Sequence, residues 1–200
     1  LLFFIGLKDD LIVIPARKKL VVQILAALLM ITFGDVRISN FHGILGIEDI
    51  HYSISLLFSL FVIIGIVNAY NLIDGIDGLA SGLGILASSF FGVWFCLTGH
   101  IQFSIMSFAL TGSLSAFFLY NVFGHKNKLF MGDTGSLVLG LLVSVMVIQF
   151  NEFSIEKTSS LAIAATPTVS FAVIIIPVID TLRVMFIRIS NGKSPFSPDK

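Results

Sequence analysis

The chain has little charge and almost no cysteine. Only 12% of its 200 residues are charged, against roughly 25% in a soluble domain, whereas 56% are hydrophobic and the mean hydropathy is +1.00. The formal net charge is zero, so no basic surface indicates a nucleic-acid partner. Cys96 is the single cysteine and lies in an apolar run, which excludes an intrachain disulfide. These shortages argue against a soluble or nucleic-acid-binding protein and predict an integral membrane protein.

Long apolar runs predict an all-α fold, a polytopic bundle of transmembrane helices. Crossing about 30 Å of hydrocarbon takes around 20 apolar residues in a helix. By this measure the chain has about six spans, which are residues 20–33, 54–67, 79–97, 103–122, 136–150 and 162–187. The first, second and fifth runs are short and need flanking residues to cross. Since the chain has no internal repeat and no low-complexity linker, the sequence predicts a single domain over residues 1–200.

Lysine and arginine gather on one face of the predicted bundle. Each span carries the chain to the other side, so the segments that share this face are 8–19, 68–78, 124–134 and 188–200. If Arg183 is counted with the loop that it adjoins, this face holds ten of the twelve Lys and Arg residues, against Arg37 and Lys157 opposite. The positive-inside rule makes this face cytoplasmic. On the opposite face, residues 36–47 alternate polar and apolar side chains around His42, a pattern that favours a small hairpin.

The sequence DGIDG places two carboxylates, Asp74 and Asp77, beside an apolar run. Ionisable groups within a membrane cost roughly 2.5–3.5 kcal/mol on insertion scales, so they usually mark a functional site. If the helix of the second span continued, the two acids would share one face. The alternative is a helix end with solvated acids, which leaves the amide of Asn71 and the glycine after each acid unexplained.

Three further polar clusters fall on the same predicted face. They are residues 8–10, residues 17–19, and Asn121 together with residues 130–136. Carboxylates with little histidine or cysteine suit a hard ion, and Mg²⁺ typically takes one or two protein carboxylates plus substrate phosphates. The clusters therefore predict Mg²⁺, with Mn²⁺ as a second candidate, and a phosphate ester or diphosphate as substrate.

Each cluster also has a purely structural interpretation. Asp9 and Asp10 fit a solvated helix end, and the basic run 17–19 fits a charge that fixes topology and contacts lipid head groups. Asp133 with Thr134 fits a helix N-cap, although the same helix start would offer amide donors to a phosphate. Structural or solvated roles are also expected for His42, His51, His100, His125 and the pair of Asp180 and Arg183.

Five motifs, in their order along the chain, resemble the polyprenyl-phosphate N-acetylhexosamine-1-phosphate transferases of glycosyltransferase family 4. They are DD at 9–10, ARKKLVVQ at 16–23, NAYNLIDGIDGLASG at 68–82, LFMGDTGS at 129–136 and PVIDTLRV at 177–184. That family transfers a sugar 1-phosphate from a UDP-sugar to a membrane polyprenyl phosphate and releases UMP. The resemblance implies a Mg²⁺-dependent, multi-pass enzyme of the bacterial inner membrane. Its active site would face the cytoplasm and start the synthesis of a cell-envelope glycan.

The resemblance also implies roles for individual residues. These are catalytic for Asp9, Asp10, Asn71 and Asp74, substrate-binding for Lys19, Asp77, Asn121 and Phe130, and metal-binding for Asp133. Within these sets Asp9 is the candidate base, and Phe130 would stack on uracil. The lipid phosphate would attack either directly or through an acyl-phosphate on an aspartate. We favour direct attack, because the phosphate is largely anionic at neutral pH.

Smaller differences between this chain and typical family members bear on which sugar is transferred and on how much of the catalytic domain is present. Muramoyl-pentapeptide transferases typically read NLTDGLDG, with threonine where this chain has Ile73. NLIDG is more like the transferases that use UDP-N-acetylglucosamine, so this sugar is preferred and phospho-N-acetylmuramoyl-pentapeptide transfer is the alternative. Family members have further spans before the DD motif and a histidine-rich motif after the last span seen here. We therefore expect residues 1–200 to be a catalytic-domain fragment that lacks both.

Two other functions compete with this one. CDP-alcohol phosphotransferases also carry D-x2-D-G, but their following Ala-Arg is replaced here by Ser81 and Gly82, and no second Asp pair follows in the next span. An ion or solute transporter would place acids at mid-membrane depth and features on both faces. For the transferase we expect a UDP-N-acetyl sugar, polyprenyl phosphate and the membrane as partners and no nucleic acid, and we leave a homodimer open.

Overall fold

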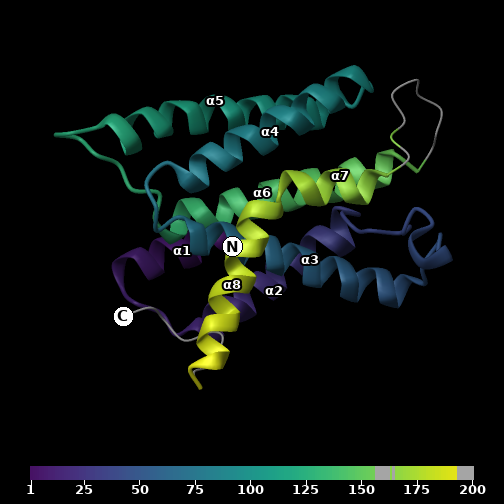
Figure 1. Cartoon of the computed structure of the whole chain (residues 1–200), viewed down its shortest axis with the longest axis horizontal. Coiled ribbons are helices and arrows are strands. Elements are labelled where there is room, and N and C mark those ends of the chain that lie inside the picture. The colour runs from purple at the N-terminus through teal and green to yellow at the C-terminus, as the bar shows by residue number, and fades with distance from the viewer. Residues whose placement is uncertain (156–162, 164, 193–200) are drawn as a thin grey trace.

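The computed structural model describes residues 1–155, 163 and 165–192, and this part of the chain is helical with no strand (Figure 1). Its helices are α1 (Leu2–Leu11), α2 (Ala16–Phe33), α3 (Tyr52–Ile73), α4 (Leu79–Leu97), α5 (Ile101–Phe123), α6 (Gly132–Phe153), α7 (Thr166–Val173) and α8 (Ile175–Ser190), with a short 3-10 turn, η1 (Ile44–Gly46). The predicted all-α transmembrane bundle is confirmed.

Among the described residues, about six spans is an overcount. Four helices, α3 to α6, are long and apolar enough to cross a membrane, and a fifth span results if α7 and α8 are taken together. Helix α2 is not among them, because its 18 residues include the basic run 17–19 and leave too short an apolar stretch. The predicted span 162–187 is bent by 68° between α7 and α8. Ala162, where that span was expected to begin, lies outside the described residues.

Helix α6 is the central helix of the bundle. In Figure 1 it runs through the middle of the molecule, with α4 and α5 on one side and α3 on the other. Its side chains are apolar on nearly all sides, and most of them are buried from Leu137 to Phe150. Gly140 lets α3 approach closely, since a Cβ there would lie 2.6 Å from the Cα of Val67. The first turn of α6 is thereby held in the centre of one end of the bundle.

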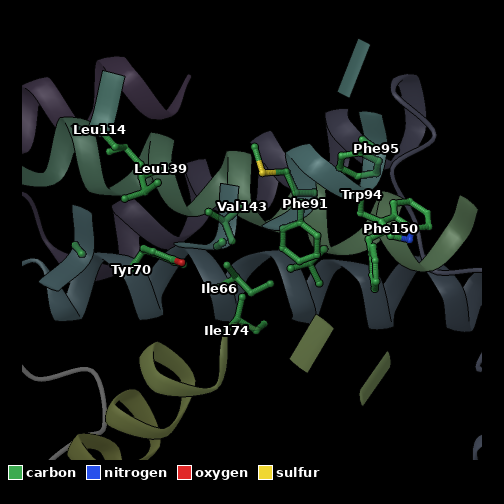
Figure 2. Close-up of a cluster of buried hydrophobic side chains, with 14 of the residues drawn as sticks. Ile66, Tyr70, Phe91, Trp94, Phe95, Leu114, Leu139, Val143, Phe150 and Ile174 are labelled. Atoms are coloured by element: carbon green, nitrogen blue, oxygen red, sulfur yellow. The ribbon is translucent and has the colours of Figure 1, made fainter. Parts of the chain in front are cut away.

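A cluster of buried hydrophobic side chains joins α3, α4, α5 and α6 in the interior of the bundle. Figure 2 shows that its labelled members are Ile66, Tyr70, Phe91, Trp94, Phe95, Leu114, Leu139, Val143, Phe150 and Ile174. Phe150 of α6 lies between two aromatic rings of α4, with its centroid 5.3 Å from that of Phe91 and 4.6 Å from that of Trp94. Such aromatic pairs add to the free energy of apolar burial and fix α4 against α6.

The predicted hairpin at residues 36–47 is present in a minimal form between residues 39 and 50, where the backbone N–H of Phe41 donates to the Glu48 carbonyl and that of Ile50 to the Ser39 carbonyl. One isolated bridge joins Asn40 to Asp49, and no strand forms among the described residues. The turn is attached to the end of α6 by Glu152, whose carboxylate accepts hydrogen bonds from the backbone N–H and the hydroxyl of Ser39, both at 2.7 Å. This end of the bundle is therefore closed by loop contacts, opposite the end that carries most of the motifs.

Candidate active site

The polar motifs meet at one end of the bundle, as the crossing pattern predicts. Helices α1, α3 and α5 end there, and α2, α4 and α6 begin there, toward the left of Figure 1. Side-chain contacts link α1 to α6, α2 to α6, α3 to α6 and the α5–α6 loop to the α3–α4 turn. Segments up to 124 residues apart in the sequence thus form one polar site.

Lys19 lies between two carboxylates. Its Nζ is 2.7 Å from an oxygen of Asp9 and 2.8 Å from an oxygen of Asp133, and all three side chains are largely shielded from solvent. Burial alone would raise the pKa of Asp9, but hydrogen bonds involving Asp133, Lys19 and the backbone N–H of Ile14 lower it to about 2. Asp9 is therefore ionised at neutral pH, and the three groups carry a net negative charge when Asp133 is ionised too.

Asn71 fixes the other side of Asp133. Its Nδ2 donates to Oδ1 of Asp133 and, at 2.8 Å, to the hydroxyl of Ser136. Since Lys19 binds Oδ2, each oxygen of the Asp133 carboxylate has a partner from a different helix. The predicted metal ligand and a predicted catalytic residue therefore lie in direct contact, and the carboxylate has one preferred orientation.

Asp10 caps α6 from outside that helix. Its carboxylate accepts hydrogen bonds from the backbone N–H of Asp133 at 2.8 Å and of Thr134 at 3.0 Å, and from the Thr134 hydroxyl. Burial would raise the pKa of Asp10, but these hydrogen bonds lower it. The structural alternative, in which Asp133 is only the N-cap of α6, does not hold, because α6 begins at Gly132 and Asp133 lies in its first turn. These two amides, expected as donors to a phosphate, are bound to Asp10.

Asp74 and Asp77 do not share a helix face. Helix α3 ends at Ile73 with Asp74 as its C-cap, and the turn to α4 contains Gly78 at a φ of +75°. Burial, followed by the charges of Asp133, Asp10 and Asp77, raises the pKa of Asp74 to about 7. Asp74 therefore keeps its proton to a much higher pH than an ordinary aspartate does.

The residues predicted for nucleotide binding surround the α5–α6 loop. Asp77 forms an ion pair with Lys128, whose Nζ also lies 5.5 Å from the ring centroid of Phe130. Phe130 is 75% exposed, so its ring is accessible to a ligand. Asn121 uses its amide to tie the backbone: its oxygen accepts from Gly78 N at 2.6 Å and its Nδ2 donates to the Leu129 carbonyl at 2.8 Å.

The sequence analysis assigned no site role to two residues that the structure places at the site, Lys128 and Gln23. Lys128 stands just before the LFMGDTGS motif, but nothing in the sequence indicates its pairing with Asp77, which is 51 residues away. Gln23 exchanges side-chain hydrogen bonds with Asn68. Gln23 follows Lys19 by four residues, so both lie on the face of α2 turned toward the site, and this spacing is a signal that sequence analysis could have used.

The carboxylates of the site suit a divalent ion that takes part of its coordination shell from substrate phosphates. No group of three or more His, Cys, Asp or Glu side chains is placed to hold a metal in the part of the chain that the structure describes. Asp9 and Asp133 are close enough to share one ammonium group. Mg²⁺ binds through one or two carboxylates and completes its shell with water and phosphate oxygens, whereas structural Zn²⁺ needs four protein ligands. The assignment of Asp133 to Mg²⁺ remains a prediction.

Comparison with known proteins finds similarity along the whole chain. The family described as glycosyl transferase family 4 matches residues 1–151. The undecaprenyl-phosphate alpha-N-acetylglucosaminyl 1-phosphate transferase of Escherichia coli K12 is 30% identical over 202 residues, with 100% of this chain and 53% of the relative covered. The decaprenyl-phosphate N-acetylglucosaminephosphotransferase of Mycolicibacterium smegmatis is 33% identical over 216 residues, covering 100% and 52%. The chain thus spans about half the length of these relatives.

Proposed function

Because the chain belongs to glycosyl transferase family 4, we propose that the full-length protein transfers a sugar 1-phosphate from a UDP-sugar to a polyprenyl phosphate. We place the reaction at the cytoplasmic face of a bacterial inner membrane. The names of the relatives support the lipid part of this proposal, since they specify undecaprenyl or decaprenyl phosphate. The charge distribution supports the orientation, because the polar end of the bundle carries most of the lysine and arginine.

The observation that carries the proposal is the cluster of Asp9, Lys19 and Asp133 at the membrane edge. In the reaction an oxygen of the lipid phosphate forms a bond to the β-phosphorus of the UDP-sugar. The bond from that phosphorus to the bridging oxygen breaks, and UMP leaves with the electron pair. Phosphoryl transfer depends mainly on positioning and on the neutralisation of spread negative charge. Lys19 supplies a fixed positive charge for this purpose, and Asp9 and Asp133 hold it in place.

Mg²⁺ is proposed as the cofactor, held by Asp133 with Asp9 as a neighbouring carboxylate. When bound, it would neutralise charge on the diphosphate and on the departing UMP. The two other contacts of Asp133 are to cationic and amide groups, which orient its oxygens. Asn71 fixes the orientation of the Asp133 carboxylate. If Mg²⁺ shared the carboxylates of Asp9 and Asp133, the ammonium group of Lys19 could also contact a substrate phosphate.

N-acetylglucosamine 1-phosphate is the proposed transferred group. Ile73 stands where muramoyl-pentapeptide transferases have threonine, and it is fully buried at the end of α3 directly before Asp74. The relatives named above are N-acetylglucosamine transferases. Transfer of phospho-N-acetylmuramoyl-pentapeptide is the second candidate. A transporter is less well supported, since the acidic motifs gather at one end of the bundle and the acids at the other end bind its loop.

A doubly labelled substrate tests the proposal. Membranes containing the full-length protein and undecaprenyl phosphate would receive UDP-N-acetylglucosamine labelled with tritium in the sugar and with ³²P at the β-phosphorus. We expect both labels in the lipid fraction in equal amounts and UMP as the soluble product. Tritium alone in the lipid would indicate transfer of the sugar without its phosphate and would contradict the proposal. UDP-N-acetylmuramoyl-pentapeptide, supplied in parallel, distinguishes the two candidate sugars.

A further inference from the structure

The two neighbouring acids of the DD motif have different surroundings. Asp9 contacts Lys19 and the backbone N–H of Ile14. Asp10 instead accepts hydrogen bonds from the first turn of α6, namely from the amides of Asp133 and Thr134 and from the Thr134 hydroxyl. Consecutive residues of a helix point about 100° apart, so one motif can serve two sites. The family resemblance implies a catalytic role for both acids, but only Asp9 shares the Lys19 ammonium group with the Asp133 carboxylate.

We propose that Asp10 is a positioning residue, which caps α6 from outside and sets the place of Asp133, and that it does not touch substrate. This inference rests on the proposed transferase function. A helix begins with amides that lack partners within the helix. In α6 the N-cap residue is Met131, which forms no side-chain cap, and Asp10 supplies the missing acceptor with a negative charge that favours the helix N-terminus.

Close packing of α1 against α6 keeps this cap in register. Gly6 lies one turn before Asp10 in α1, and a Cβ at Gly6 would stand 2.5 Å from the Cα of Thr134. The two helices therefore touch through their backbones at the same turn of α6 that Asp10 caps. Because contact and cap both act on Thr134, a change at Asp10 should shift the first turn of α6 rather than the whole bundle.

The cap places a limit on how phosphate is bound. The amides of Asp133 and Thr134 are engaged by a carboxylate, so they are not donors to a substrate phosphate. A phosphate approaching that helix end would also meet the negative charge of Asp10. The positive charge for the diphosphate must then come from side chains such as Lys19. Asp10 would influence the reaction only through the position of Asp133, because it binds the backbone N–H of that residue.

The test compares Asp10→Asn and Thr134→Val in the full-length protein. Asn keeps one acceptor oxygen but turns an NH₂ group toward an amide, and Val keeps the shape of threonine but removes the hydroxyl. If Asp10 acts through Asp133, Asp10→Asn should raise the Mg²⁺ concentration for half-maximal transfer by roughly 10–100-fold, the usual effect of losing a partner of a metal ligand. Thr134→Val should raise it less, and most turnover should return at saturating Mg²⁺. The matched controls are Asp35→Asn and Thr32→Val, at exposed positions toward the other end of the bundle.

Amide exchange gives a readout that does not depend on activity. Hydrogen exchange at the first turn of α6 should speed up in Asp10→Asn and Thr134→Val and stay unchanged in both controls. If wild-type protein failed to transfer the labelled phosphate, the proposed function would be wrong, and the exchange data would still decide the cap. Loss of turnover in Asp10→Asn at every Mg²⁺ concentration, with unchanged exchange in α6 and wild-type behaviour of Thr134→Val, would show that Asp10 acts on the substrate and overturn the inference.

Discussion

Gln23 of α2 and Asn68 of α3 donate a side-chain hydrogen bond to each other, at 3.3 and 2.9 Å. Gln23 is only 2% exposed and Asn68 is partly buried, so the pair is largely shielded from solvent between two helices. Lys19 lies one turn before Gln23 on the same helix. The amide pair therefore fixes the rotation of α2 about its axis and with it the direction of the Lys19 side chain.

Replacement of Gln23 by leucine should destabilise the protein, because Oδ1 of the partly buried Asn68 loses its donor, while Nδ2 keeps only its hydrogen bond to the Ile64 carbonyl. We expect a loss of about 1–3 kcal/mol in the free energy of unfolding, the usual cost of an unsatisfied buried polar group. Denaturant unfolding of the full-length protein in detergent measures this loss. The double variant Gln23→Leu with Asn68→Leu should lose less than the sum of the single variants. Additive losses would mean that the two amides do not stabilise each other.

Replacement of Asp133 by asparagine should lower transfer at least about a hundredfold, the scale of one key electrostatic contact in a catalytic site. The change keeps the size of the side chain and removes the charge proposed to hold Mg²⁺. Initial rates with the full-length enzyme measure the effect, with Asp35→Asn as the control. Wild-type activity of Asp133→Asn would remove the basis for the metal assignment.

Phe130→Ala and Asp9→Asn should affect different kinetic constants. The exposed ring of Phe130 is proposed to stack on uracil, so its loss should raise the KM for the UDP-sugar by an amount equal to about 1–3 kcal/mol, by analogy with base stacking on aromatics. Asp9→Asn should mainly lower kcat, since Asp9 holds the Lys19 ammonium group proposed to stabilise the charge of the transferring phosphate. Steady-state kinetics with both substrates varied separate the two. The reverse pattern would show that the roles are assigned wrongly within the correct family.

The orientation of the bundle can be tested by labelling single cysteines. Cys96 is exposed and is the only cysteine, so it is first replaced by alanine. A cysteine at Lys126 should then react with an impermeant reagent only from the cytoplasm, and one at Glu48 only from outside. These positions lie in loops at opposite ends of the bundle. Labelling of both from the same side would contradict the arrangement.

Asp74 should make the ligand-free protein less stable as the pH rises. Its pKa is about 7 in the folded protein, against the ordinary aspartate value of 3.8 that applies to an unfolded chain. Between these values the folded state binds more protons than the unfolded state, so the free energy of unfolding falls with increasing pH and levels off above about 7. Asp74→Asn removes this contribution. Thermal unfolding of both proteins at a series of pH values should show that the stability of the variant rises relative to that of the wild type from about pH 4 to pH 7. A constant difference would mean that the pKa of Asp74 is not raised in this way.

Local patterns were sufficient to predict most of the bundle. The apolar runs placed both ends of α4 to α6 and the start of α3 within about four residues, but α3 continues six residues beyond the predicted end of its run at residue 67. Counting the apolar runs as crossings placed Asp9, Lys19, Asn71 and Asp133 at one end. The structure agrees because α2, although too short and too basic to count as a span, still runs from that end toward the loop at the other end. Helix α2 was counted as a span, since its apolar part was considered without the three basic residues of its first turn.

Contacts between distant residues could not be predicted. The sequence around Asp10 does not say which helix its carboxylate will cap, because the partner is 123 residues away. The end of α3 at Ile73 depends on the turn that Gly78 permits, whereas the spacing of Asp74 and Asp77 also suits a longer helix. Asn121 was assigned to the nucleotide by its motif, and only its position between Gly78 and Leu129 reveals its bonds to the backbone.

The central place of α6 has a consequence for biogenesis. The helices α1, α3, α4 and α7 all pack on α6, yet α1 to α5 leave the ribosome before it. Until α6 enters the membrane, the earlier helices have no common partner, and Asp10 and Asn71 lack the amides and side chains that bind them, whereas Asp9 can already pair with Lys19. Helices α1 and α3 must therefore remain in lipid, or beside the insertion machinery, with the polar groups of Asp10 and Asn71 unmatched. Nascent chains arrested before residue 132 should consequently be the preferred targets of membrane proteases and chaperones.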